Sequence, residues 1–333
     1  MELEITSIDE LSEKEKSDVD NFIMSPDTNG EFINSLEYLS YHGNRFEEDS
    51  IVVRDKGSKT VKGVLLATIN SDDSTMVISH QGTTFAGPII SIRDSYSMVN
   101  QVVKMMLSYY EKKYAHIRLR ITPVFYAQQE AGILDYILMQ NNYHYGMTAL
   151  SNVIRIEKID SEESLLKNYI ARRRNQVRKV LKSGEFVFGR ADSINPDIWK
   201  IMNSNLKERY ESGTTHTYEE INGLQTKMPC NILPYEVRHI CGKYAAFALV
   251  YKFKNVFHTQ YLDMNYEYSA DYPNRILIHH LILEARKEGF SVFSLGACTE
   301  KMGKYLNEGL LEYKFGFGGG NIILPEYSKD IDI

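Results

Sequence analysis

The chain has 333 residues, of which 43% are hydrophobic and 25% are charged, and its formal net charge is −6. A chain of this length forms more than one compact unit, and the composition is not that of a disordered protein. The negative charge disfavours a protein that grips DNA, RNA or an anionic membrane over its whole surface. Cys230, Cys241 and Cys298 include no CxxC pair, which argues against a disulfide framework and for a reducing compartment.

No targeting or membrane segment is recognisable in the sequence. The first residues, MELEITSIDELSEKEK, are acidic and alternate polar with apolar side chains, unlike a signal peptide. The longest apolar run, ILIHHLIL, is interrupted by two histidines and is far shorter than the about 20 residues that span a membrane. We therefore expect a soluble, cytoplasmic protein without a membrane span.

The first half of the chain mixes helix and strand signals. A helix is predicted over residues 12–24, and a short helix over EFINSLEYLSYH follows the turn at SPDTNG. Strands are predicted at SIVVRD, KGVLLATIN and TMVISH. Apolar residues at three- and four-residue steps from Val99 to Tyr110 predict an amphipathic helix. The strand HIRLRITP, a further helix and the segment YHYGMTALSNVIRIE complete this half.

The second half repeats much of this order. Ser161 is predicted to cap a single helix over SEESLLKNYIARRRNQVRKVLKSG, which Gly184 closes. Two further helices follow, one of them starting at a capping box of Thr217 and Glu220. The strands KYAAFALVYKF and VFHTQYLDMN come next, and the helix NRILIHHLILEARKEG then leads into the strand FSVFSLGA.

The recurring order of elements predicts the fold class and the domains. We expect a mixed α/β protein with domains at residues 1–157 and 158–333, each with a mostly antiparallel sheet flanked by helices. Near the C-terminus, LNEGLLEYKFGFGGGN ends in a glycine run. A phosphate-binding glycine loop precedes a helix, whereas this run follows a predicted helix and precedes the strand IILPEY. The glycines are therefore predicted to end the helix and lead into the last strand.

Several segments resemble a known family. HTQYLDMN, FSLGACTEKMGKYLNEGLLEYKFGFGG and RRRNQVRKVLKSG, with FINSLEYLSYHGNRFEEDSIVV and ISHQGTTFAGPIIS in the first half, resemble the tandem GNAT acyltransferases related to the Fem-type peptidoglycan ligases. The resemblance covers nearly the whole chain. It implies two GNAT-like domains, an acyl donor and an acceptor that meet in or beside the cleft between them, and transfer of an acyl group to an amine.

The sequence departs from the family where the donor pyrophosphate would bind. GNAT enzymes that use acyl-CoA usually have a Q/R-x-x-G-x-G/A turn, whose backbone amides hold the pyrophosphate. The corresponding place here reads EYSADYPNRILI and contains no glycine. We therefore predict that Arg275 contacts phosphate directly.

The resemblance also suggests catalytic residues. In GNAT domains an asparagine, a tyrosine and a Gly-Phe pair follow the fifth strand, and the tyrosine can protonate the leaving thiolate. Asn307, Tyr313, Gly316 and Phe317 keep this order, with Tyr313 one residue closer to the Gly-Phe pair. The resemblance implies Tyr313 as the acid, the alternative being a tyrosine at the edge of the core. His258 is the candidate general base because its unperturbed pKa lies near neutrality, with a structural histidine as the alternative.

Other polar side chains complete the predicted site. Glu308 is a third catalytic candidate, and Asn307 and Lys314 are candidate cofactor ligands, although solvated positions are expected for Glu308 and Lys314. In the basic helix, Arg174 and Arg178 are candidate phosphate ligands, the alternative being a solvated helix face.

The predicted substrate-binding residues are His216, Tyr261, Thr84 and Phe85. Strict alternation along the strand places His258 and Tyr261 on opposite faces. Cys298 is predicted to be a buried cysteine rather than a nucleophile, and no metal site is predicted.

Together these features predict an N-acyltransferase. The expected donor is acetyl-CoA or another acyl-CoA, and the expected acceptor is the amine of a small molecule such as an amino sugar or a nucleotide-sugar. One alternative is a Fem-like transferase that moves an aminoacyl group from tRNA to a cell-wall precursor. The net charge and the lack of a long heptad-bearing insertion disfavour tRNA. The other alternative is a degenerate GNAT pair that binds a ligand without catalysis.

Overall fold

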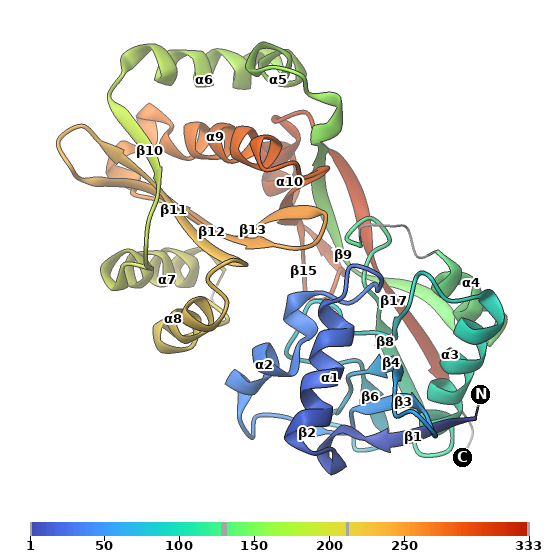
Figure 1. Cartoon of the computed structure of the whole chain (residues 1–333). Coiled ribbons are helices and arrows are strands. Elements are labelled where there is room, and N and C mark those ends of the chain that lie inside the picture. Colours follow the sequence, from blue (N-terminus) through green and yellow to red (C-terminus); the bar gives the residue numbers. More distant parts are fainter. Residues whose placement is uncertain (1, 128–131, 211–212, 332–333) are drawn as a thin grey trace. The chain divides into compact units, whose positions relative to one another are not determined.

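The computed structural model describes residues 2–127, 132–210 and 213–331 (Figure 1). The chain forms two compact units: unit 1 is Met1–Ala149 with Ile323–Ile333, and unit 2 is Leu150–Ile322. The chain leaves unit 1 within strand β9 (His144–Arg155) and returns to it within strand β17 (Gly320–Asp330). Both units combine helices with mostly antiparallel strands, which confirms the predicted mixed α/β class. The domain boundary predicted at 157/158 lies shortly after the crossing in β9, and the return through β17 formed no part of that prediction.

Unit 1 contains a sheet with a helix on each face. The sheet has the order β1-β3-β4-β7 and is antiparallel throughout. Alternate strand residues separate its two faces: Val53 and Leu65 pack with one group of apolar side chains, and Val52 and Val64 pack with another. The elements are β1 (Leu3–Ser7), β3 (Ile51–Asp55), β4 (Val61–Leu65) and β7 (Ile89–Ile90), with helices α1 (Glu13–Met24) and α3 (Tyr96–Glu111).

A second group of strands in unit 1 has the order β17-β8-β6-β5-β2, and the last residues of the chain contribute its first member. Residues Glu326–Asp330 of β17 pair antiparallel with β8. Tyr327 is buried there and donates a hydrogen bond to Asp135 Oδ1 at 2.9 Å. The other elements are β2 (Glu47–Glu48), β5 (Thr68–Ile69), β6 (Met76–Ile78) and β8 (His116–Arg120), with α2 (Leu36–Leu39) and α4 (Ile133–Gln140).

Unit 2 is built on a sheet of order β10-β11-β12-β13-β14-β9. All neighbouring strands are antiparallel except β13 and β14, which are parallel. The strands are β10 (Phe186–Arg190), β11 (Ile232–His239), β12 (Tyr244–Lys252), β13 (Val256–Met264) and β14 (Val292–Ala297), and a short pair, β15 (Thr299–Glu300) and β16 (Tyr305–Leu306), follows β14.

Helices cover both faces of this sheet. Helix α9 lies between the sheet and α6, and α7 and α8 lie on the opposite face (Figure 1). Eight residues of α9 are buried, so this helix forms the centre of the unit 2 core. The helices are α5 (Glu162–Asn168), α6 (Ala171–Ser183), α7 (Pro196–Tyr210), α8 (Tyr218–Lys227), α9 (Pro273–Lys287) and α10 (Glu308–Phe315).

The single helix predicted after Ser161 is instead two helices. Ser161 caps α5 as expected, and Gly184 ends α6 with a left-handed φ of 67°. Between them, Tyr169 is extended, with ψ 145°. Its buried ring packs against Phe317, and its hydroxyl lies 3.1 Å from His279 Nδ1. The prediction was wrong because these contacts with distant parts of the chain outweigh the local preference for helix.

The glycine run near the C-terminus behaves as predicted. Helix α10 ends at Phe315, Gly316 is its C-cap, and β17 starts at Gly320. Gly318 has a φ of 80°, and a Cβ atom there would lie 2.2 Å from the carbonyl oxygen of Asn168. Only glycine fits at this position, because both the backbone conformation and the contact exclude a side chain.

Candidate active site

The parallel strands β13 and β14 of unit 2 pair over only part of their length. Three positions pair, from Val256 opposite Val292 to His258 opposite Ser294. Beyond them β13 continues to Met264, whereas β14 keeps pairing with β9 on its other side as far as Ala297. Both strands are irregular near the point of separation: the β12 pairing of β13 skips Gln260, and the β9 pairing of β14 skips Leu295. The edge of β13 that faced β14 is therefore left without a partner strand among the described residues.

The irregularity in β13 corrects one sequence prediction. His258 lies opposite Tyr251 and Tyr261 lies opposite Leu249. Tyr251 and Leu249 are two residues apart on β12, so their partners share one face of the sheet. The prediction that His258 and Tyr261 face opposite sides was wrong because Gln260 adds one unpaired residue between them, as in a β-bulge.

His258 lies at the point where β13 and β14 separate. Its Nδ1 atom is 2.9 Å from the hydroxyl of Ser294, which is buried on β14. Burial lowers the pKa of His258 to about 3, and the nearby Lys314 cation acts in the same direction. The imidazole is therefore neutral at physiological pH. Its role as a general base stays a prediction.

Lys314, on α10, is the buried cation of this region. The sequence suggested a solvated position, but the residue is only 7% exposed. Its ammonium donates to the carbonyl oxygens of Gly296 at 3.1 Å and Ala297 at 2.7 Å, at the end of β14. Burial lowers its pKa to about 8. A lysine ammonium has three N–H groups, so one remains after these two hydrogen bonds.

Cys298 follows directly on this end of β14. It is fully buried, and burial raises the pKa of its thiol while the Lys314 cation opposes that shift. Its Sγ atom lies 3.9 Å from the carbonyl oxygen of Gly296. A buried thiol with a raised pKa is a poor nucleophile, which agrees with the prediction of a core cysteine.

A second buried cation, Arg173 of α6, lies between two aromatic rings. Its guanidinium is 4.5 Å from the ring centroids of both Tyr313 and Phe317, and Nη2 donates to the Tyr313 carbonyl at 2.9 Å. Arg173 is 6% exposed, and its Nε and Nη1 atoms are buried without a hydrogen-bond partner in the described residues. Burial lowers its pKa to about 10. The ring of Tyr313 thus packs beneath an arginine, and its role as an acid stays a prediction.

The N-terminus of α9 brings a further arginine to this region. A 3₁₀ turn over Tyr266–Asp271 takes the place of the glycine-containing turn, and Tyr272 adopts a left-handed φ of 59° as the N-cap of α9. The Arg275 guanidinium lies 3.9 Å from the centroid of the Tyr272 ring. Burial lowers the pKa of Arg275, and the charge of Arg172 contributes in the same direction. Arg172, Arg173 and Arg275 are therefore close enough to influence one another, in what we call the arginine cluster.

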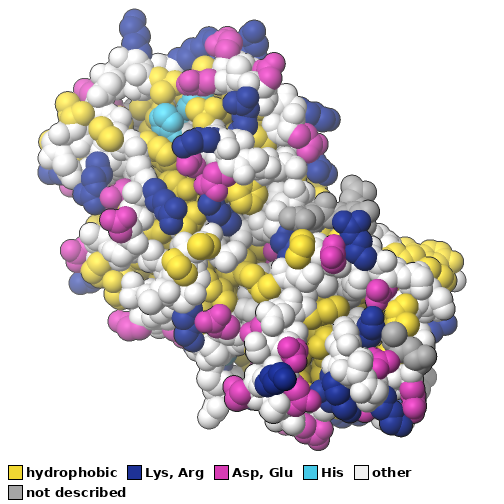
Figure 2. All heavy atoms as spheres, viewed as in Figure 1, with side chains coloured by type: hydrophobic (Ala, Val, Ile, Leu, Met, Phe, Trp, Pro, Cys, Tyr) yellow, Lys and Arg dark blue, Asp and Glu magenta, His cyan; other side chains and the backbone are white. Residues whose placement is uncertain are grey.

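The other predicted ligands of α10 and α6 have varied surroundings. Asn307 caps α10: its Oδ1 accepts from the backbone of Leu310 at 3.0 Å, and its Nδ2 donates to Glu300 at 2.9 Å. Glu308 is exposed in the first turn of α10. Arg178 pairs with Glu163 at 3.1 Å, and Arg174 is partly exposed on the same helix. Figure 2 shows Lys and Arg side chains, with acidic side chains between them, along the edge of unit 2 where α5 and α6 lie.

The predicted substrate residues fall in both units. In unit 2, His216 and Tyr261 are buried together, with His216 Nδ1 2.7 Å from the Tyr261 hydroxyl, and the Tyr261 ring packs edge-on against Trp199. Thr217 and Glu220 form the predicted capping box beside them. In unit 1, Thr84 is exposed, whereas Phe85 is buried against Tyr126.

Sequence reasoning missed two members of the site. Arg173 was counted with the solvated face of a basic helix, although its place in the apolar stripe next to Val177 was a usable signal. Ser294, on β14, carried no signal at all, because only strand pairing brings it to His258. The described residues contain no group of three or more His, Cys, Asp or Glu side chains that could hold a metal ion.

Comparisons with known proteins bear on the fold of the chain. Residues 167–314 match the family model of the Acetyltransferase (GNAT) domain. No curated protein matches the sequence significantly. Among solved structures, FemX superposes with a TM-score of 0.70 at 13% identity, over 99% of this chain and 98% of its own.

Two further solved structures are similar in fold. A conserved protein of unknown function from Bacteroides thetaiotaomicron VPI-5482 has a TM-score of 0.58 at 10% identity, covering 99% of this chain and 100% of its own. L-PGS from Bacillus licheniformis has a TM-score of 0.55 at 10% identity, covering 89% and 86%. Within the described residues, no helix is both long and apolar enough to cross a membrane.

Proposed function

Starting from a GNAT-type acyltransferase with a Fem-like fold, we propose that this protein transfers an acyl group from an acyl-CoA, such as acetyl-CoA, to the amine of a small acceptor such as an amino sugar. The observation that supports this proposal best is the separation of β13 from β14 beside the buried Lys314 ammonium. Unit 2 contains all three groups that the proposal needs. The edge of β13 supplies backbone hydrogen-bonding groups for the donor, the arginine cluster supplies positive charge for its phosphates, and Lys314 supplies a proton donor for the reaction.

The unpaired edge of β13 suits an extended donor. The backbone from Thr259 onward has no partner strand on that side among the described residues. An extended chain that carries amide groups can pair with such an edge, as peptides do with exposed strands. The pantetheine arm of CoA carries two amides in an extended chain and would bind in this way.

The arginine cluster suits the donor pyrophosphate. Arg275 lies in the first turn of α9, where the backbone N–H groups and the helix dipole favour an anion. Buried Arg173 and exposed Arg172 add positive charge nearby. In this proposal guanidinium groups replace part of the hydrogen bonding that a glycine turn supplies in other GNAT enzymes.

The chemistry requires one bond to form and another to break. The acceptor amine attacks the thioester carbonyl, the C–N bond forms, and the tetrahedral oxyanion collapses with loss of the CoA thiolate. The amine loses a proton and the thiolate gains one. The third N–H of Lys314 is proposed to stabilise the developing negative charge, because a cation in a water-poor site has its largest effect there. With a pKa of about 8, Lys314 can also supply a proton to the thiolate and then take up the proton that the acceptor nitrogen loses, which restores its charge.

The remaining candidates take supporting roles in this proposal. His258 is neutral, and its contact with the Ser294 hydroxyl is proposed to hold β13 and β14 together at the point where they separate. His216 and Tyr261, which share a face of the sheet with His258, are proposed to contact the acceptor. Tyr313 is proposed to position Arg173 rather than to transfer the proton itself.

Donor binding tests the proposal directly. Isothermal titration of the full chain with acetyl-CoA, followed by mass spectrometry of products from a panel of amino sugars, should show saturable binding and an acylated amine with release of free CoA thiol. Absence of binding at millimolar donor, in protein whose circular dichroism shows it folded, would rule the proposal out.

A second candidate is aminoacyl transfer from tRNA to a cell-wall precursor. It is favoured by the superposition with FemX over almost the full length of both chains. Arg172, Lys179 and Lys182 of α6 are exposed and would contact RNA phosphates. Binding of charged tRNA with an affinity that falls steeply with salt, together with no response to acyl-CoA, would support this candidate over the first.

A further inference from the structure

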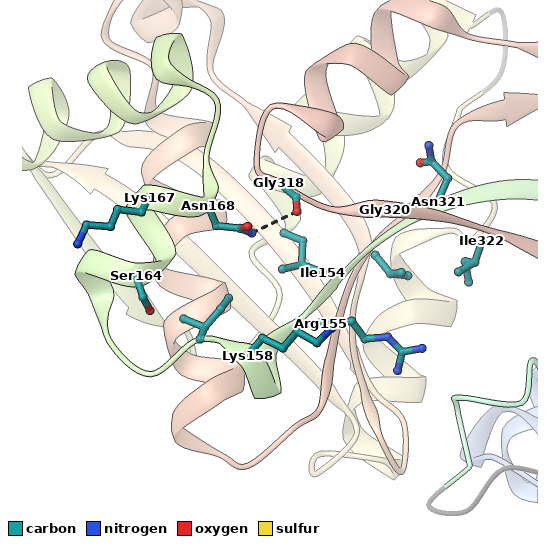
Figure 3. Close-up of a pocket in the computed structure, with 12 residues that line it drawn as sticks. Ile154, Arg155, Lys158, Ser164, Lys167, Asn168, Gly318, Gly320, Asn321 and Ile322 are labelled. Atoms are coloured by element: carbon teal, nitrogen blue, oxygen red, sulfur yellow. Dashed lines mark hydrogen bonds between the residues drawn. The ribbon is translucent and has the colours of Figure 1, made fainter.

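A pocket of about 580 Å³ lies in unit 2 between α5, the end of β9 and the glycine run (Figure 3). Its volume is in the range that holds a small molecule. Its lining residues include none that the candidate active site uses.

The charged residues that line this pocket are all positive. Arg155, Lys158 and Lys167 line it, and no acidic residue does. The side chains of Lys158 and Lys167 make no hydrogen bond or ion pair with the described residues. In Figure 3 the Lys158 side chain extends toward the backbone of Arg155, whereas the Arg155 guanidinium and the Lys167 ammonium point away from the pocket in opposite directions. A concave site whose charged lining residues are all cations favours anions, here in a protein whose net charge is −6.

The rest of the pocket wall is apolar or backbone. Ile154 and Ile159 are buried, and the wall opposite them is the backbone of Gly318 and Gly320. Asn168 donates a hydrogen bond to the Gly318 carbonyl at 3.2 Å, which ties the end of α5 to the glycine run (Figure 3). The pocket is therefore formed before any ligand arrives, and its glycine wall has no side chain that would fill it.

We propose that this pocket binds a small phosphorylated molecule other than the acyl donor. The phosphate is held by Lys158, with Arg155 and Lys167 turning inward to meet it, and the apolar wall holds the rest of the molecule. Phosphate fits this site better than a carboxylate because it carries more charge and has three oxygens to share among the cations. The ligand is an effector, and the proposal does not depend on the proposed function.

Lysine footprinting of the full chain locates the site. With inorganic pyrophosphate as the probe at low ionic strength, acetylation of Lys158 and Lys167 by an amine-reactive ester should slow at least about fivefold at saturation. Lys200, an exposed lysine of α7 in the same unit, is the internal control and should react at an unchanged rate. Equal slowing at all three lysines, or none at any, would overturn the proposal.

Variants separate this pocket from the donor site. The double variant Lys158→Ala/Lys167→Ala should weaken pyrophosphate binding at this pocket at least about tenfold, because charge-assisted hydrogen bonds are lost, whereas Lys200→Ala should not. Arg275→Ala should leave the protection of Lys158 and Lys167 intact. If Arg275→Ala abolishes that protection, or if CoA alone reproduces it, the pocket belongs to the donor site and the proposal of a separate ligand fails. Failure of acetyl-CoA to bind, with protection intact, would count against the proposed function alone.

Discussion

Unit 2 buries two positive charges, those of Lys314 and Arg173, and stabilises each with a different kind of group. Lys314 is held by two backbone carbonyls at the end of β14, whereas Arg173 lies between the rings of Tyr313 and Phe317. Burial lowers the pKa of Lys314 to about 8 and that of Arg173 to about 10. At neutral pH the lysine is therefore close to releasing its proton and the arginine is not. The difference suggests that Lys314 takes part in chemistry and that Arg173 supplies a fixed charge and packing.

Removing the charge of Lys314 is the strongest test of whether this residue, unlike Arg173, takes part in the chemistry. Lys314→Met should lower the turnover of acyl transfer by at least about a hundredfold, the size of effect seen when one donor to a developing oxyanion is lost. The fold should survive, because replacing a buried charge with an apolar side chain of similar volume is often neutral or stabilising. Turnover assays and thermal unfolding of the same sample check both expectations. An active Lys314→Met variant would remove Lys314 from the mechanism.

The titration of Lys314 should make both turnover and stability depend on pH, which distinguishes Lys314 from Arg173. Lys314 is charged below its pKa of about 8, so turnover that depends on the cation should fall as the pH rises through 8. Lys314→Arg, if active, should lose this falling limb because arginine stays charged. Stability should respond in the opposite direction: between pH 8 and 10.5 the unfolded chain binds more protons at this residue, so the free energy of unfolding rises with pH. A rate profile that is flat through pH 8 would contradict the assignment.

Replacing Arg275 tests whether its positive charge contributes to binding of the acyl donor. Arg275→Ala should weaken acetyl-CoA binding by about tenfold or more, since a hydrogen bond between charged groups contributes about 1.5–3 kcal/mol. Arg178→Ala is the matched control, because Arg178 already pairs with Glu163 on the surface. Calorimetric titration of both variants measures the effect, and equal affinities would remove Arg275 from the donor site.

Arg173 should matter more for stability than for binding. Arg173→Ala removes a side chain that fills the space between two aromatic rings, and it should lower the free energy of unfolding by about 2–3 kcal/mol. The neighbouring Arg172 is exposed, and Arg172→Ala should change stability by no more than about 0.5 kcal/mol. Urea unfolding of both variants is the measurement. If the two behave alike, Arg173 does not pack as described.

The smallest expected effect concerns His258. Its folded-state pKa of about 3 lies below the 6.5 of an unperturbed histidine, so the unfolded chain binds more protons between these values. Stability should therefore fall as the pH drops, by roughly 1–2 kcal/mol between pH 6.5 and 5. His258→Asn should flatten this part of the curve. Unfolding midpoints measured across pH, with His280→Asn as a second histidine variant, test the expectation.

Features that depend on neighbouring residues were predicted from the sequence, whereas features that depend on contacts between distant segments were not. The cap at Ser161 and the Thr217–Glu220 capping box are interactions between near neighbours, and both are present. Strand β11 was not predicted, and it contains Pro234, a residue that central strands usually exclude. Strand β10 ends opposite Tyr235, and the carbonyl oxygen of Pro234 accepts a hydrogen bond from the backbone of Ala191 at 3.0 Å.

The site was harder to predict than the fold for the same reason. The extra residue at Gln260 becomes visible only when β13 pairs with β12. Lys314 looks like a surface lysine in sequence, and it is buried only because α10 packs on the end of β14. The resemblance suggested which residues to consider, whereas their burial and pKa values depend on contacts between segments far apart in the chain.

The path of the chain through β17 sets an order of assembly. Unit 1 lacks the strand that pairs with β8, and lacks Tyr327 in its core, until β17 has been synthesised. Domains usually fold one after another from the N-terminus as the ribosome releases them. Here unit 1 is completed only after unit 2 has been synthesised, so its β8 edge is open to misassociation while unit 2 is being made.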